Sequence, residues 1–306
     1  MEYRILGKTG LRISRVGFGG IPIQRIEAAQ AHGLLQAVAD AGINFIDTAK
    51  AYTVSEAYIG ESIEGMRDRF VLATKSGAKT RAAMAADISD SLRKLRTDYI
   101  DLYQIHNPNP TQFDAICAPG GALEALLDAR DSGKIGHIGV TAHSAEVFER
   151  ALTLDWVETI MFPYNIVEQQ GRELIDRCAA AGKGFIDMKP LAGGAIEDGR
   201  LALRYVLSNP AVTVSIPGMA TVEELNGIKD SYDPRKLYES DPLLHRVLDT
   251  LIDGTFPDED GMLKELHTAL LDGASWHKPD QYFLFYDFDS YKKARLRVNH
   301  DYCDRI

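Results

Sequence analysis

The chain has few cysteines and no long apolar run. Cys117, Cys178 and Cys303 lie far apart, and no CxxC pair occurs. A disulfide framework and a zinc or iron–sulfur site are therefore not expected, because each needs several suitably spaced thiols. No stretch reaches the roughly 20 apolar residues that span a bilayer, and the first residues contain no apolar signal segment. We expect a cytoplasmic protein without a metal centre.

Basic residues are fewer than acidic ones. The sequence has 34 Lys and Arg against 44 Asp and Glu, which gives a formal net charge of −10. Binding to nucleic acid or to an anionic membrane surface is not expected, because both need a cationic surface. A phosphate-bearing cofactor remains compatible with this charge, since helix N-termini and a few local cations are enough to bind it. The expected partner is a small molecule, and assembly into a homo-oligomer is left open.

Several motifs of known chemistry are incomplete. GKTG at 7–10 lacks the glycine that a P-loop needs five positions earlier, where Glu2 stands. GFGGIP at 17–22 has Pro22 in place of the third glycine of a dinucleotide-binding turn. FPDEDG at 256–261 lacks the ligand spacing of an EF-hand loop, and neither HExxH nor GxSxG occurs. None of these classes of site is therefore expected.

What the sequence does contain is a regular alternation of short apolar runs and amphipathic runs. The expected strands are residues 16–19, 45–48, 70–74, 99–105, 135–141, 159–164, 184–188 and 213–216. The expected helices are residues 28–41, 82–95, 122–132, 146–152, 173–181 and 201–208, and a further helix follows Ser55 as its N-cap. About eight such repeats predict an α/β fold, a (β/α)8 TIM barrel. An open doubly wound sheet is the alternative.

The two ends of the chain depart from this alternation. Residues 3–6 and 11–13 flank GKTG and predict a β-hairpin that closes the N-terminal mouth of the barrel. After residue 232 we expect two helices, at 243–252 and 262–271, and then the aromatic run QYFLFYDFDSY. We interpret 1–232 as the barrel and 233–306 as an extension packed on it, not an independent domain. This extension either covers barrel helices or a subunit interface, or closes over the barrel mouth.

Four polar residues stand at or just after expected strands. Asp47 and Lys75 end two of these strands, His106 ends a third, and Tyr52 lies on the loop after the first. Each residue alone has an ordinary structural explanation, such as a turn cap or a packed ring. In a parallel barrel, however, the strand ends share one face, so the four side chains are expected to converge.

This set of residues supports proton transfer to a carbonyl oxygen. A phenol has a pKa near 10, and a nearby ammonium lowers that pKa by favouring the phenolate. Asp47 would keep Lys75 charged, Tyr52 would donate the proton, and His106 would hold the carbonyl oxygen in place. No side chain delivers hydride, so a nicotinamide cofactor would have to supply it.

Longer motifs place the chain beside a known family. YRILGKTGLRISRVGFGG, NFIDTAKAYTVSEAYIGESI, VLATKSG, LRKLRTDYIDLYQIH, GKIGHIGVTAHS and MKPLAGG…SIPGMATVEEL together resemble the aldo-keto reductases over residues 1–228. The resemblance implies a (β/α)8 barrel that reduces an aldehyde or ketone reversibly. It implies Asp47, Tyr52, Lys75 and His106 as the catalytic residues, with Tyr52 as the general acid.

The same resemblance implies a nicotinamide dinucleotide across the C-terminal face of the barrel. The implied cofactor contacts are Gly20, Asp47, Thr141, Lys189, Pro190, Leu191, Gly193, Pro217, Gly218, Thr221 and Glu224. The chain departs from the family pattern at Ala142, Met161 and Met188, which replace an Asn, a Gln and a Tyr near the nicotinamide. The family favours NADP, whereas Glu224 in place of an Arg favours NAD. We expect NADP, with NAD not excluded.

Two other functions are compatible with this sequence. One is a catalytically weak nucleotide-binding sensor or regulatory subunit, which the three departures and the aromatic tail favour. The other is Schiff-base lyase chemistry with Lys75 or Lys189 as the nucleophile, which a charged Lys75 disfavours. The substrate is not identified by the sequence. Residues 107–121 are expected to form a long loop that lines the pocket.

Overall fold

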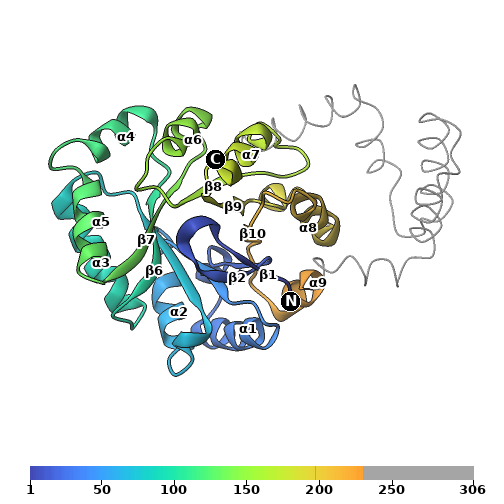
Figure 1. The fold of residues 1–306 in the computed structure, drawn as a ribbon. Coiled ribbons are helices and arrows are strands. Elements are labelled where there is room, and N and C mark those ends of the chain that lie inside the picture. Colours follow the sequence, from blue (N-terminus) through green and yellow to red (C-terminus); the bar gives the residue numbers. More distant parts are fainter. Residues whose placement is uncertain (197, 230–306) are drawn as a thin grey trace, which may run out of the picture. The chain divides into compact units, whose positions relative to one another are not determined.

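The structure, a computed structural model, describes residues 1–196 and 198–229 (Figure 1). By its internal contacts the chain divides into two units, Met1–Tyr232 and Asp233–Ile306. The expected tail helices, the aromatic run and the packing of the extension on the barrel lie outside the described residues and stay predictions. Among the described helices, none combines the length and the apolar character needed to cross a membrane.

Eight strands form one parallel sheet in which each strand pairs with its neighbours along the chain. They are β3 (Phe18–Gly19), β4 (Phe45–Asp47), β5 (Val71–Ser76), β6 (Ile100–His106), β7 (Ile135–Thr141), β8 (Thr159–Pro163), β9 (Gly184–Met188) and β10 (Val214–Ser215). Parallel bridges from Val16 to Ser215 and from Gly19 to Gly218 join the first strand to the last. The sheet therefore closes into a ring, which confirms the barrel and excludes the open sheet.

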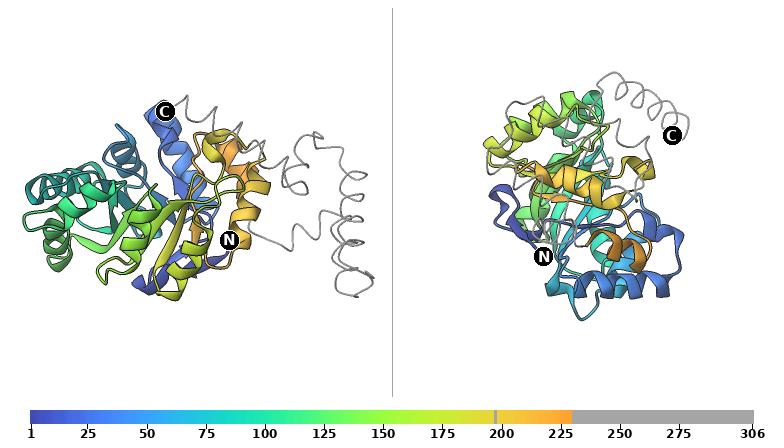
Figure 2. Two further views of the ribbon diagram at one scale, coloured as in Figure 1. Left: turned by 90° about the horizontal axis from the view of Figure 1, so that it is seen from above. Right: turned by 90° about the vertical axis from the view of Figure 1, so that its right-hand side faces the viewer.

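Helices lie outside this ring of strands (Figure 1, Figure 2). They are α1 (Ala28–Asp40), α2 (Ser55–Ser62), α3 (Arg81–Lys94), α4 (Pro110–Cys117), α5 (Ala122–Asp131), α6 (Ala145–Leu152), α7 (Arg172–Ala180), α8 (Gly199–Ser208) and α9 (Val222–Ile228). Short 3-10 turns are η1 (Gly7–Thr9), η2 (Pro22–Arg25), η3 (Arg67–Arg69) and η4 (Ala192–Gly194). The six helices expected from periodicity are all present, with ends that differ by at most two residues.

Two expectations about helices are wrong. Ser55 is the first residue of α2 and not its N-cap, because its hydroxyl donates to the Gly20 carbonyl at 2.9 Å and lies 2.8 Å from the Thr48 hydroxyl. Residues 107–121 are not one long loop, since they contain α4. The Asn109 side chain accepts from the Gln112 amide, and the Gln112 side chain accepts from the Asn109 amide. This capping box starts the helix directly after a short turn.

The N-terminal hairpin closes the interior of the barrel, its lumen, at the end where the strands begin, as predicted. Strands β1 (Tyr3–Ile5) and β2 (Arg12–Ser14) pair antiparallel. Leu6 and Ile13, both fully buried, pack on lumen side chains that come from strands around the ring: Phe45, Ala73, Leu102, Met161, Ile186 and Val214. The Lys8 amide donates to the carbonyl of Gly182, which lies in the turn just before β9. The plug leaves the opposite, C-terminal mouth for a site.

Candidate active site

Asp47 and Lys75 form a buried ion pair at the C-terminal end of the lumen. They come from neighbouring strands β4 and β5, and each residue is 2% exposed. Lys75 Nζ donates to Asp47 Oδ2 at 2.5 Å and to the Thr48 carbonyl at 2.7 Å. Because a buried charge is costly unless it is paired, these contacts define the position of the ammonium closely.

Tyr52 and His106 complete the set. Tyr52 lies in the turn between β4 and α2, and Lys75 Nζ is 5.1 Å from the centroid of its ring. His106 ends β6, and its ring meets the Tyr52 ring edge to face with centroids 6.0 Å apart. The structure therefore brings the four predicted catalytic side chains together at one end of the lumen.

Burial is the largest influence on the protonation of three of these groups. It raises the pKa of Asp47, although Lys75 acts in the opposite direction. It lowers the pKa of His106 to about 4, with Lys75 and then His143 adding to the effect. Burial also raises the pKa of the Tyr52 phenol, and this outweighs the lowering by Lys75. The net direction for Tyr52 is thus opposite to the lowering expected from the sequence.

A buried polar partner of Asp47 was not predicted from the sequence. Gln104 is completely buried on β6, and its Nε2 donates to Asp47 Oδ1 at 3.1 Å. A signal was available, because inward-facing positions alternate along a strand and His106 stands two residues further on. Gln104 therefore belongs to the same inward face of β6 as His106.

Gly20 and Thr141, two of the predicted cofactor contacts, lie at the same end of the barrel. The Gly20 amide donates to the Asp47 carbonyl at 2.8 Å. A Cβ at Gly20 would lie 2.9 Å from the Asp47 carbonyl oxygen and from the Ser55 hydroxyl, so only glycine fits. Thr141 ends β7, and its Oγ1 accepts from the Asn107 amide at 2.9 Å. Asp47, assigned to both roles, ends β4, the strand next to β3 and Gly20.

The other predicted cofactor contacts lie on the loops after β9 and β10. Lys189 has a φ of 59°, and the Asn165 side chain donates to its carbonyl at 3.0 Å. Pro190 and Pro217 are buried, Leu191 is half-buried, and Gly193 and Gly218 are exposed. Thr221 accepts from the Glu224 amide at 3.1 Å as the N-cap of α9.

Glu224 has a structural role in this loop. Its Oε2 accepts from the amides of Ala220 and Thr221 at 2.6 and 3.2 Å, which completes a capping box at the start of α9. The carboxylate therefore satisfies backbone donors next to it. Its expected contact with a cofactor ribose stays a prediction.

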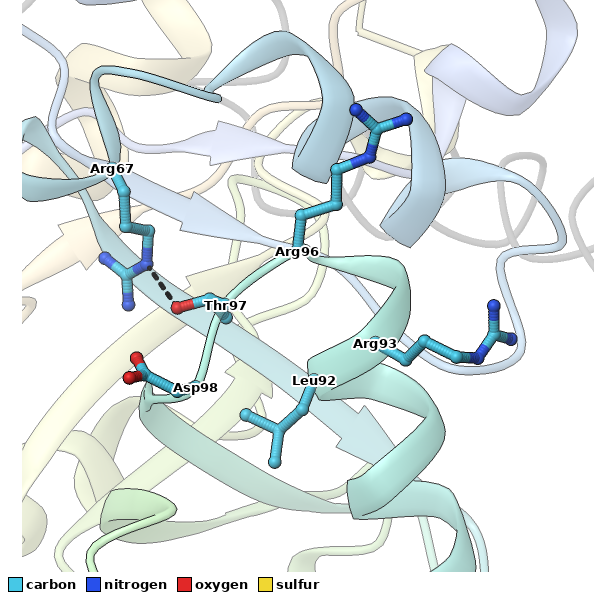
Figure 3. Close-up of a pocket in the computed structure, with 6 residues that line it drawn as sticks. All are labelled: Arg67, Leu92, Arg93, Arg96, Thr97 and Asp98. Carbon is cyan, nitrogen blue, oxygen red and sulfur yellow. Dashed lines mark hydrogen bonds between the residues drawn. The ribbon is translucent and has the colours of Figure 1, made fainter.

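A surface hollow of about 570 Å³ lies beside the segments that precede β5 and β6 (Figure 3). It is lined by Arg67, Leu92, Arg93, Arg96, Thr97 and Asp98. Each of the three arginines already bonds a carboxylate, on Asp101, Asp90 and Glu64 respectively. Its lining residues come before β5 and β6, whereas Asp47 and Lys75 stand at or near the other ends of their strands. Because its arginines already form ion pairs within the protein, we do not assign a ligand to this hollow.

Comparison with known proteins decides the family. The family model described as "Aldo/keto reductase family" matches residues 15–201, a range that includes Asp47, Tyr52, Lys75 and His106. The chain belongs to the aldo/keto reductase family. The resemblance stated from the motifs is thereby confirmed, and this family member is a relative of characterised oxidoreductases.

Similar proteins extend this result. The aldo-keto reductase YhdN of Bacillus subtilis is 33% identical over 57% of this chain, and the match spans 57% of that relative's own length. The 6-dehydroglucose reductase of Novosphingobium aromaticivorans is 34% identical over 75% of this chain and 80% of its own. A crystal structure of an aldo/keto reductase from Klebsiella pneumoniae, in complex with NADP and acetate, aligns with a TM-score of 0.66. It covers 76% of this chain and 89% of that one at 24% identity, which supports the fold.

A second family model, that of carbohydrate phosphorylases, matches residues 213–306. The sequence reasoning did not detect this similarity. The described part of the matched range, residues 213–229, supplies strand β10 and helix α9 to the barrel. The match covers less than half of the chain, and the rest of it lies outside the described residues.

Proposed function

We propose that this aldo/keto reductase reduces an aldehyde or ketone to an alcohol, reversibly, with NADP as the hydride carrier and Tyr52 as the proton donor. The observation that carries the proposal is the grouping of four side chains: Lys75, paired with Asp47, lies 5.1 Å from the centroid of the Tyr52 ring, and that ring meets the His106 ring edge to face. A small carbonyl compound is the substrate class that this arrangement suits. The reductase and dehydrogenase activities are the two directions of one reaction.

The residues act on the carbonyl oxygen. His106 is neutral at physiological pH because burial lowers its pKa, so one ring N–H can donate to that oxygen and hold it near the phenol. Tyr52 transfers its hydroxyl proton to the oxygen as negative charge develops there. Lys75, fixed by Asp47, stabilises the phenolate that remains. In the reverse direction the phenolate takes the proton from the alcohol.

The loops after β9 and β10 fit a nicotinamide dinucleotide. Gly193 and Gly218 are exposed and carry no side chain of their own, so their backbone could approach a pyrophosphate closely. Thr141, Lys189 and the loop at 217–221 would hold the cofactor, which supplies hydride when bound. The NADP found in the Klebsiella relative supports NADP here. NAD stays compatible, because Glu224 stands at the expected ribose position.

A nucleotide-binding sensor remains the second candidate. Ala142 and Met161 are buried and Met188 is half-buried, so three positions near the expected nicotinamide offer no hydrogen-bonding group from the side chain. This function would give binding of NADPH or NADH without turnover of any carbonyl compound. The same experiment separates the two candidates.

The test is the Tyr52→Phe variant, assayed by the loss of nicotinamide absorbance with a panel of aldehydes, ketones and sugars. We expect turnover to fall by at least about 100-fold, the usual contribution of a general acid, while the dissociation constant of NADPH stays the same. Tyr58→Phe, on the outer helix α2, is the matched control and should retain wild-type turnover. Full activity in Tyr52→Phe would remove Tyr52 from its assigned role.

A further inference from the structure

Gln104 has no role in the proton transfer described above, yet it lies beside the reacting groups. It is completely buried, and in the strand register it pairs with Lys75 on one side and Gly139 on the other. Its amide is thus placed between the ion pair and the next strand.

Asp47 is held at both of its carboxylate oxygens. Oδ2 accepts from Lys75 at 2.5 Å, and Oδ1 accepts from Gln104 Nε2 at 3.1 Å. An ionised carboxylate only accepts hydrogen bonds, so the Gln104 side chain must present its NH2 group to Asp47. Two contacts on opposite oxygens fix the rotation of the carboxylate, whereas Lys75 alone would leave it free to turn about its Cβ–Cγ bond.

The oxygen of the Gln104 amide shows that a contribution to stability is not enough to explain why a glutamine stands at this position. Within the described part of the chain, Gln104 Oε1 and Thr159 Oγ1 are buried and have no hydrogen-bond partner. An unpaired buried oxygen lowers stability, and an apolar side chain of the same length would avoid that loss. Gly139 makes room for the amide, because a Cβ there would lie 2.3 Å from Thr159 Oγ1 and 3.0 Å from Gln104 Cγ.

We propose that Gln104 is a positioning residue of the reaction: it clamps Asp47 Oδ1 so that Oδ2 directs Lys75 toward Tyr52. This inference rests on the proposed reductase function. Gln104 is completely buried and its side chain bonds Asp47 Oδ1, so it acts through Asp47.

The clamp has a consequence for protonation. Asp47 faces Lys75 from β5 and Tyr52 from the loop after β4, while neutral Gln104 and His106 come from β6. Burial raises the pKa of Asp47, and the hydrogen bonds from Lys75 and Gln104 both lower it. Without the Gln104 amide, Asp47 takes up a proton at a higher pH and releases Lys75 there.

The experiment compares Gln104→Met and Gln104→Asn in the full chain. Met removes the amide at nearly the same length, and Asn keeps an amide but withdraws it from Asp47 by one methylene. We expect kcat to fall by about ten-fold in both, as for the loss of a hydrogen bond to a charged group, with KM for NADPH unchanged. The acidic limb of the kcat profile should move to higher pH. In an Asp47→Asn background neither substitution should lower kcat further.

Thr159→Val is the matched control, because it removes a buried hydroxyl that makes no hydrogen bond within the described residues. It should leave kcat and the pH profile as in the wild type. Carbon-13 NMR of the Asp47 carboxyl gives a readout besides activity: its pKa should rise in Gln104→Asn. An unchanged Asp47 pKa, or losses that add to those of Asp47→Asn, would refute the clamp. If the wild type turns over no carbonyl compound while the Asp47 pKa still rises in Gln104→Asn, the clamp stands and the reductase function is refuted.

Discussion

At the scale of single residues, exclusion of water determines which groups carry charge. For Asp47, Tyr52 and His106 the largest cause of the pKa shift is burial, and the charge of a neighbour comes second. The Tyr52 phenol is therefore held in the protonated form that a proton donor needs for reduction. The imidazole of His106 is neutral, so it donates a hydrogen bond without adding a second positive charge beside Lys75.

The neutrality of His106 can be measured directly. Its pKa is lowered to about 4, so the imidazole should show no titration between about pH 5 and 8, the range in which an unperturbed histidine changes charge. Nitrogen-15 NMR of the ring measures this, with the exposed His32 on α1 as the comparison. A midpoint for His106 near neutral pH would contradict the assigned role of a neutral donor.

Much of the site at this scale was predictable from residue types at strand ends. Asp47, Lys75 and His106 follow apolar runs, and a parallel barrel places such ends on one face. Gln104 was missed although it shares the inward face of β6 with His106, because the sequence does not reveal whether a polar side chain in an apolar strand bonds a buried group or water. The sequence also failed to predict that the pKa of Tyr52 is raised overall. That shift depends on how deeply the phenol is buried, which the periodicity of the sequence does not show.

At the scale of elements, helix α2 packs unusually closely on the end of α3. A Cβ at Gly60 would lie 2.3 Å from the Lys94 carbonyl oxygen and 2.5 Å from the Leu95 carbonyl carbon. Because both neighbours are backbone atoms, they cannot move aside as a flexible side chain would. This contact supports the helix that starts directly after the Tyr52 turn.

Gly60→Ala should therefore lower the free energy of unfolding by about 1–3 kcal/mol, the usual cost of overpacking, although alanine is the better helix former. The control is Gly33→Ala in α1, where no atom lies within 4 Å of the added Cβ. That substitution should raise stability by about 0.5–1 kcal/mol. Denaturant unfolding of both variants measures the difference, and equal stability changes would disprove the close packing.

Element positions were the best predicted property, because the period of the apolar pattern separates strands from helices. Helix α4 was missed because residues 107–121 contain three prolines and two adjacent glycines, which suggest a loop. Its start signal, Asn109 followed by Pro110 and then Gln112, is that of a capped helix. The hydroxyl of Ser55 bonds to a loop instead of capping α2, and such a tertiary contact leaves no local signal.

At the scale of the whole molecule, the lumen is sealed at one end by the hairpin. Leu6 is completely buried, and a Cβ at Gly184 would lie 2.5 Å from its Cδ1. The order of strands around the ring followed from the order of the repeats. The role of residues 233–306 could not be derived from the sequence, because that segment lacks the alternation of strands and helices. It falls within the range matched by a second family model.

Leu6→Ala should lower the free energy of unfolding by about 2–5 kcal/mol, because it opens a cavity at the sealed end of the lumen. Ile5→Ala is the control: this neighbour is 52% exposed and should change stability by less than about 0.5 kcal/mol. Thermal and denaturant unfolding are suitable measurements. Similar losses in the two variants would show that the hairpin does not seal the lumen.

The bridges that join Val16 to Ser215 and Gly19 to Gly218 also affect how the chain folds during its synthesis. They connect segments from near the beginning and the end of the barrel sequence, and contacts of such long sequence separation are slow to form. During synthesis, an emerging chain that stops before β10 exposes unpaired edges on β3 and β9. Chaperone protection at that stage would matter most for this protein, because open strand edges invite pairing with other chains.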